Sequence, residues 1–125
     1  MSFLSKFLNS SGILENSKIM EDYDQLFLDN EEIEVGFKLI EDIFIFTNKR
    51  LIVIERKKDQ EDILAYTSLP YSQISYFTVE AKKSFDLKSV LKIWLSGQSE
   101  VVVEKEFNKS VDVYEVQKML ADHVL

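Results

Sequence analysis

His123 is the first residue to consider for chemistry, because an imidazole can bind a metal or transfer a proton near neutral pH. A structural zinc site needs four ligands, mostly Cys or His, and a catalytic one needs three. The chain has no cysteine and only this one histidine. The surrounding pattern also predicts that His123 lies on the last turn of a helix. We therefore predict a structural or solvated role for His123 and no metal site.

Carboxylate pairs are the second kind of candidate, since a carboxyl group in an apolar pocket can act as a general acid or base. The pair Glu31-Glu32 and the group Asp59, Glu61 and Asp62 stand in polar stretches, where water is expected to relieve their repulsion. The sequence also lacks a glycine-rich phosphate loop and a serine-centred nucleophile elbow. It therefore predicts no catalytic residue, no bound cofactor and no enzymatic activity.

Two basic clusters, Arg56-Lys57-Lys58 and Lys82-Lys83, could attract anions. The chain as a whole has 15 Lys and Arg against 22 Asp and Glu, a net charge of −7. That charge repels phosphate backbones and anionic lipid headgroups at long range. We therefore predict no nucleic-acid partner and rank a membrane surface well below a protein partner.

Apolar side chains near the N-terminus predict a short amphipathic segment around Lys6. Such a segment could lie on a membrane, but interfacial helices are usually longer and more basic. An arm docked on the domain or on a neighbouring subunit is the favoured interpretation. Its apolar residues are Phe3, Leu4, Phe7 and Leu8.

The stretch 42–55 predicts a tight β-hairpin, with two β-branched and aromatic runs on either side of Asn48-Lys49. Pairing of Thr47 with Arg50 would place four isoleucines on one face and bulky apolar residues on the other. Because a hairpin with a wet side alternates apolar and polar residues, both faces need a cover. We predict a barrel core on one side and a helix or second subunit on the other. The two faces are Ile43, Ile45, Ile52 and Ile54, and Phe44, Phe46, Leu51 and Val53.

The remaining elements follow from periodicity. A helix capped by Asn16 or Ser17 runs to about Phe27, and a C-terminal helix begins near Val111, with Glu115 on its wet face. Leu91, Ile93 and Leu95 share one face of a late strand, so Trp94 faces the other way, either as a contact anchor or packed under the N-terminal helix or another loop. A three-residue loop, 97–99, sets Ile93 against Val103 and Lys92 near Glu104. The predicted strands are 33–40, 63–69, 73–81 and 87–96, in addition to the hairpin and the strand after residue 99.

The elements predict a mostly β fold with about seven antiparallel strands in a partly open barrel, capped by a C-terminal α-helix. The chain has 125 residues, which is enough for one domain. We expect residues 1–32 to form a short helical arm packed on a barrel of residues 33–125. The absence of cysteine and of a secretory or membrane-spanning stretch predicts a cytoplasmic location.

Several motifs occur in the order found in the bacterial pleckstrin-homology-like domain family, which the chain resembles from about Ser11 to Leu125. They are 47–52 (TNKRLI), 68–74 (SLPYSQI), Phe77 with Glu80, 85–87 (FDL), 91–94 (LKIW) with Ser96-Gly97, and 113–118 (VYEVQK). The charged loop 56–62 and the loop 81–84 lack the glycine of the family pattern. The resemblance implies a seven-stranded barrel, no catalysis and assembly of single-domain members into closed rings.

We therefore predict a homo-oligomeric, ring-forming module for protein recognition, with fivefold symmetry as the first expectation and a partner protein of unknown identity. The candidate contact residues are Thr47, Asn48, Lys49, Arg50 and Trp94, together with the apolar N-terminal arm. A lipid-headgroup-binding adaptor and a small-ligand-binding barrel are the alternatives. Eukaryotic relatives that bind phosphoinositides carry several basic residues on the first hairpin loop, whereas this chain has Glu41-Asp42 there.

Overall fold

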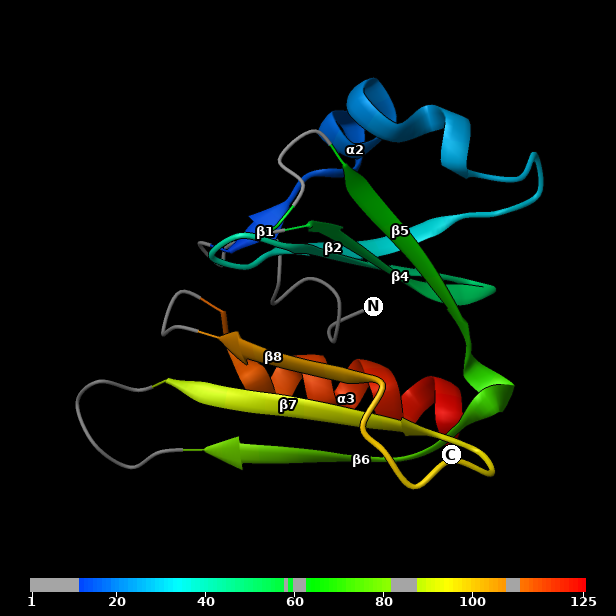
Figure 1. Cartoon of the computed structure of the whole chain (residues 1–125). Coiled ribbons are helices and arrows are strands. Elements are labelled where there is room, and N and C mark those ends of the chain that lie inside the picture. Colours follow the sequence, from blue (N-terminus) through cyan, green and yellow to red (C-terminus); the bar gives the residue numbers. More distant parts are fainter. Residues whose placement is uncertain (1–11, 58, 60–62, 82–87, 108–110) are drawn as a thin grey trace. The chain divides into compact units, whose positions relative to one another are not determined.

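The computed structural model describes residues 12–57, 59, 63–81, 88–107 and 111–125. The chain divides into two compact units, Met1–Leu69 and Pro70–Leu125. The predicted boundary after residue 32 lies inside the first unit. Figure 1 shows the helices and strands of each unit.

The first unit is built on a five-stranded sheet in the order β1-β2-β3-β4-β5. β1 has only two residues and was not predicted, whereas the four longer strands match the predicted ones. The helix α2 lies over this sheet and continues into a short 3-10 turn, η2 (Figure 1). The bounds are β1 Ile13–Leu14, α2 Asn16–Tyr23, η2 Asp24–Leu26, β2 Ile33–Lys38, β3 Ile43–Thr47, β4 Arg50–Arg56 and β5 Leu64–Pro70.

The central hairpin, β3 with β4, has the predicted register, with Ile45 opposite Ile52 and Phe46 opposite Leu51. Its isoleucine face is covered by the chain itself. Ile19 of α2 packs with Ile45 and Ile52 in one buried cluster, and all three are at most 1% exposed. The predicted helical cover is therefore confirmed on this face, and no second subunit is needed there. The other face is buried as well, since Phe44, Phe46, Leu51 and Val53 are at most 2% exposed.

The start of α2 differs from the predicted cap. Glu15 occupies the N-cap position and its side chain makes no capping hydrogen bond. The Asn16 side chain instead donates a hydrogen bond from Nδ2 to the carbonyl oxygen of Ile33, at 3.2 Å. This contact joins the helix to the first residue of β2, so Asn16 positions α2 on the sheet.

The second unit contains a three-stranded antiparallel sheet, β6-β7-β8, and the helix α3 (Figure 1). Ile93 lies opposite Val103 and Lys92 opposite Glu104, which confirms the register predicted from a three-residue loop. Within that loop Gly97 has a φ of 79°, a conformation that favours glycine. The bounds are η3 Tyr71–Gln73, β6 Ile74–Ala81, β7 Ser89–Leu95, β8 Val103–Phe107 and α3 Val113–Val124.

Asp112 is the N-cap of α3, and its carboxylate accepts a hydrogen bond from the Tyr114 backbone N–H at 3.0 Å. Its predicted apolar stripe is buried at Val113, Val116, Met119 and Leu120. One prediction for this helix is wrong: Glu115 is 9% exposed rather than wet. Its Oε1 lies 3.5 Å from the Lys118 ammonium, while Oε2 is buried without a hydrogen-bond partner.

Candidate interaction site

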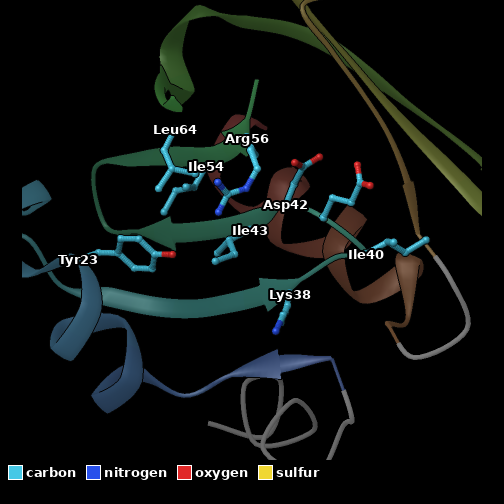
Figure 2. A pocket seen from close by; sticks show the side chains of 9 residues that line it. Tyr23, Lys38, Ile40, Asp42, Ile43, Ile54, Arg56 and Leu64 are labelled. Carbon is cyan, nitrogen blue, oxygen red and sulfur yellow. The ribbon is translucent and has the colours of Figure 1, made fainter. Parts of the chain in front are cut away.

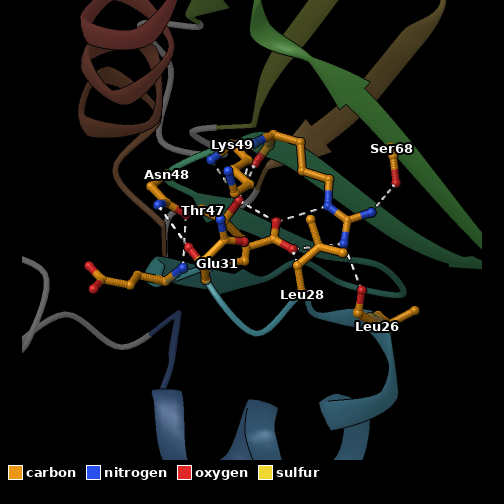
Figure 3. Close-up of polar contacts among 10 residues, drawn as sticks. Leu26, Leu28, Glu31, Thr47, Asn48, Lys49 and Ser68 are labelled. Atoms are coloured by element: carbon orange, nitrogen blue, oxygen red, sulfur yellow. Dashed lines mark hydrogen bonds and ion pairs between the residues drawn. The ribbon is translucent and has the colours of Figure 1, made fainter.

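The turn between β3 and β4 holds a buried ion pair with Glu31 (Figure 3). Arg50 donates from Nε to Glu31 Oε2 and from Nη2 to Oε1, both at 2.9 Å. The Glu31 side chain is 0% exposed, and that of Arg50 is 23% exposed. Arg50 also donates to the Leu26 carbonyl oxygen at 2.6 Å and to Ser68 Oγ at 2.7 Å. One guanidinium therefore joins η2, the loop before β2 and strand β5.

Thr47 and Asn48 complete this network. The Thr47 hydroxyl lies 2.6 Å from Glu31 Oε2 and accepts a hydrogen bond from the Arg50 backbone N–H at 3.1 Å. Asn48 Oδ1 accepts from the Glu32 backbone N–H at 2.8 Å, and Asn48 Nδ2 donates to the Asn30 carbonyl oxygen at 3.4 Å. Thr47, Asn48 and Arg50 therefore bind the preceding segment of their own chain.

The bidentate hydrogen bonds from Arg50 are the main reason that the pKa of Glu31 falls to about 2. The Thr47 hydroxyl and the Leu28 backbone N–H lower this pKa further, while burial opposes the shift. Our expectation that Glu31 lies in a solvated turn is therefore wrong. Of the four predicted contact residues in this turn, Lys49 and Asn48 remain exposed to solvent.

A shallow pocket of about 200 Å³ lies in the first unit beside the turn between β2 and β3 (Figure 2). Lys38 and Arg56 line it, together with the acidic pair Glu41 and Asp42. Tyr23 also lines the pocket, and burial together with the nearby Asp22 carboxylate raises its pKa. Cations and carboxylates are thus mixed, whereas a phosphate-binding pocket concentrates cations. The remaining lining residues are Ile40, Ile43, Ile54 and Leu64.

Trp94 stacks on Tyr76 from the neighbouring strand β6. The two ring centroids are 4.5 Å apart and the ring planes differ by 8°. Tyr76 is 53% exposed, and Trp94 is partly exposed. The buried neighbours Leu91 and Ile93 are both 0% exposed, so Trp94 lies on the opposite face of β7 from them, as predicted.

A β-bulge at the start of β6 brings Tyr76 to this position. Ile74 pairs with Leu95, and the next pair is Tyr76 with Trp94, so Ser75 is the extra residue. Because side chains alternate along a strand, regular pairing would set Ser75 beside Trp94 and turn Tyr76 to the buried side. The bulge thus creates an aromatic pair that strand periodicity alone does not predict.

We call the exposed side of this sheet the outer face. It is built from the side chains that alternate away from Leu91 and Ile93. Its residues are Tyr76, Thr78 and Glu80 of β6, Val90, Lys92 and Trp94 of β7, Glu104 and Glu106 of β8, and Val102 just before β8. Lys92 was expected near Glu104 and is its cross-strand partner, but its ammonium bonds to Glu80 at 3.2 Å.

Other sequence predictions have different outcomes. Phe3, Leu4, Phe7 and Leu8 lie outside the described residues. His123 stacks on the buried Tyr71 with ring centroids 3.9 Å apart, which places it in a packed contact between α3 and η3. Among the residues that the structure describes, no group of three or more His, Cys, Asp or Glu side chains is placed to hold a metal ion. In the same part of the chain, no helix is long and apolar enough to cross a membrane.

Comparison with known protein families identifies the family of this chain. The sequence model of the family "Bacterial PH domain" matches residues 2–124. This chain is a member of the bacterial PH domain family. It is 37% identical over 121 residues to the uncharacterized protein YjqA of Bacillus subtilis, covering 97% of each chain. It is also 31% identical to the uncharacterized protein YozO of the same organism over 102 residues, covering 81% of this chain and 85% of YozO.

Two crystal structures support the same assignment. A DUF1696 family protein with a pleckstrin-homology domain from Shewanella loihica has a TM-score of 0.78 and 34% identity, covering 91% of this chain and 97% of that one. A pleckstrin-homology domain from Shewanella amazonensis has a TM-score of 0.77 and 35% identity, covering 88% and 98%. The predicted fold class, a mostly β PH-like fold with a C-terminal helix, is therefore confirmed.

Proposed function

We propose that this bacterial PH domain is a cytoplasmic, non-catalytic module that binds a protein partner through its outer face and assembles with itself into a closed ring. The observation that carries the proposal is the stacked pair of Tyr76 and Trp94 on an exposed sheet surface. Tyrosine and tryptophan are enriched among the residues that dominate the energy of protein interfaces. Their exposure here leaves apolar ring area that a partner can remove from water.

The geometry of the pair favours recognition over a purely structural role. An aromatic residue kept for packing is normally buried, whereas Tyr76 is 53% exposed and stands on a strand at the edge of its sheet. The rings are already stacked, so little side-chain freedom is lost when a partner binds. A flat aromatic surface on a rigid sheet is therefore suited to a contact with another protein.

Self-association has a different basis. The two sheets end at the strands β1 and β5 and at β6 and β8. Edge strands have backbone N–H and C=O groups that a neighbouring copy can pair, and a head-to-tail contact of this kind closes into a ring when its rotation divides a full turn. The isoleucine face of the hairpin does not support assembly, because α2 already covers it. The proposed ring has five copies.

Light scattering coupled to gel filtration at micromolar concentration tests the assembly. The expected mass is five times the 14.6 kDa of one chain. A single species of one-chain mass would refute self-association.

Partner capture from the source cell tests recognition, with Tyr76→Ser and Trp94→Ser compared to Tyr114→Ser. Tyr114 is 60% exposed on α3 and is a matched control for an exposed tyrosine. Loss of the captured protein with the first two variants, and retention with the control, is the expected result. Equal capture by all three variants would refute the assignment of the outer face.

Binding of a lipid headgroup is the second candidate, supported by the pocket that Lys38 and Arg56 line beside the first hairpin turn. The exposed side chains of Ile40 and Leu64 lie on the same pocket and could touch a bilayer. Glu41 and Asp42 oppose an anionic headgroup, which is why this candidate ranks second. Salt-sensitive co-sedimentation with phosphatidylserine vesicles, lost in a Lys38→Glu variant, would reverse the ranking.

A further inference from the structure

We infer that the outer face binds a basic, arginine-bearing segment of a partner protein. This inference rests on the proposed function, which assigns protein recognition to the same face, and it adds the chemistry of the partner. Two features carry it: the aromatic pair, and the excess of exposed carboxylates on the strands around that pair.

The charges of the outer face are predominantly negative. Its three strands contribute three glutamates, Glu80, Glu104 and Glu106, and one lysine, Lys92. The glutamates are also the more accessible groups, since the Glu80 and Glu106 side chains are 55% and 56% exposed and that of Lys92 is 27% exposed. A partner approaching this surface therefore meets the Glu80 carboxylate before the Lys92 ammonium, while Lys88, just before β7, is 53% exposed beside Glu106.

Among the residues that the structure describes, the two basic groups on and beside this face, Lys92 and Lys88, are engaged with acids. Lys92 Nζ lies 3.2 Å from Glu80 Oε2. Lys88, which precedes β7, has its Nζ 4.0 Å from Glu106 Oε1. Glu104 stands across the strand pair from Lys92, two residues along β8 from Glu106. The arrangement leaves a net negative surface, which complements a cationic segment.

The aromatic pair supplies the second part of the recognition. Aromatic faces attract cations, and a guanidinium stacks on them more often than an ammonium. Lys92 lies between Glu104 and Thr78 in the same cross-strand row, one row along the sheet from Trp94 and Tyr76. An extended segment that crosses the strands can thus place one arginine on the rings and the next near Glu104 or Glu106.

Two other occupants fit less well. Single-stranded RNA stacks on exposed aromatic residues, but such sites combine the rings with a positively charged groove, and this face is negative. A second copy of the chain has more acidic than basic residues, with a net charge of −7, so it offers no excess of cations to the carboxylates of the outer face. A basic segment satisfies both the rings and the carboxylates.

Trp94 is the only tryptophan of the chain, so its fluorescence reports directly on occupancy of the outer face. The probe is a capped nine-residue peptide of alternating arginine and glycine, titrated into the full chain at low and physiological salt. We expect saturable quenching of Trp94 that weakens with salt. Replacing the arginines by lysine should weaken binding by about threefold, because the ammonium stacks less well, and replacing them by glutamate should abolish it.

The double variant Glu104→Gln/Glu106→Gln should bind the arginine peptide about fivefold more weakly, since it removes two exposed charge contacts. The control is Glu21→Gln/Asp122→Asn, which removes the same charge from exposed positions on α2 and α3 and should leave affinity unchanged. Circular dichroism establishes that each variant is folded. A Tyr76→Ala variant should also lose quenching.

Three results would overturn the inference: no quenching by the arginine peptide, equal quenching by the glutamate peptide, or unchanged affinity in the double variant. Quenching by oligouridylate in place of the arginine peptide would also overturn it and indicate a nucleic-acid surface. The proposed function is tested separately, by the capture of a partner protein. A captured protein whose binding depends on Trp94 but not on Glu104 and Glu106 would support the proposed function and contradict the inference of a basic partner segment.

Discussion

Replacing Glu31 by glutamine should destabilise the protein at neutral pH and should do so less at low pH. The substitution keeps the size of the side chain and removes its charge. It takes away the partner of Arg50, whose Nε and Nη2 lie 2.9 Å from the two carboxylate oxygens. Because the Glu31 side chain is 0% exposed, solvent does little to screen this ion pair.

The size of the effect follows from the pKa. The folded-state pKa of Glu31 is about 2, compared with an ordinary value of 4.5. Each pKa unit corresponds to about 1.4 kcal/mol, so the charged carboxylate contributes about 3 kcal/mol to the free energy of unfolding at pH 7. Removing one partner of a buried pair typically costs a similar amount, about 3–5 kcal/mol.

The sign of the pH dependence follows from the lowered pKa. A carboxyl group whose pKa is lower in the folded state stabilises the fold at pH values above its unfolded pKa, and this stabilisation is lost as pH falls toward the folded value. For Glu31 the window lies between about pH 5 and pH 2. About 2 kcal/mol of the contribution should be gone by pH 3.

Urea unfolding followed by Trp94 fluorescence at pH 7 and pH 3 measures both quantities. The gap in unfolding free energy between the parent protein and Glu31→Gln should be about 3 kcal/mol at pH 7 and about 1 kcal/mol at pH 3. Glu32→Gln is the control, because Glu32 is the adjacent exposed acid. A gap below about 1 kcal/mol at pH 7, the range of exposed ion pairs, or a gap that does not change with pH, would refute this reasoning.

Two further substitutions test the packing and the capping. A Cβ on Gly36 would lie 2.5 Å from Ile19 Cδ1 and 3.3 Å from the Leu14 carbonyl oxygen, so Gly36→Ala should lower stability by about 1–2 kcal/mol in urea unfolding. Ile19→Val removes that Cδ1, so the double variant should be more stable than the sum of the two single effects predicts. Simple additivity of the two effects would contradict this explanation. Asp112→Ala removes the cap of α3 and should cost about 1 kcal/mol in thermal unfolding, while Asp122→Ala, exposed near the other end of the helix, should change stability little; equal losses would argue against the cap.

Much of the fold could be predicted from the sequence, because the deciding signals are local. The hairpin of β3 and β4 is specified by two apolar runs around a two-residue turn, and its observed pairs, such as Ile45 with Ile52, are the predicted ones. The register of β7 and β8 followed from matching apolar side chains across a short loop, with Ile93 opposite Val103. In both cases only neighbouring segments compete for the pairing, so periodicity is sufficient.

The polar network could not be predicted, because its members are far apart in the sequence. Glu31 and Arg50 are separated by 19 positions, and Leu26 and Arg50 by 24. A glutamate beside another glutamate in a polar stretch has the composition of a solvated turn. Only the folded chain shows that the segment before β2 returns across the β3–β4 turn and encloses the carboxylate. The burial of Glu115 was not predicted for a related reason. Helical periodicity gives the direction of its side chain on α3 but not which part of the protein covers that side.

The aromatic pair shows how a single irregularity changes a predicted surface. With regular alternation, Ile74, Tyr76 and Thr78 would share one face of β6, and Tyr76 would be buried with Ile74. Because Ser75 is an extra residue in the strand, the side chains after it point to the opposite face from the one that regular alternation predicts. Ile74 is therefore 5% exposed, whereas Tyr76 is 53% exposed. A bulge has no distinctive sequence when glycine is absent, and here it determines which side chain stands beside Trp94. The irregular position of the strand is therefore also the position that gives the outer face its aromatic surface.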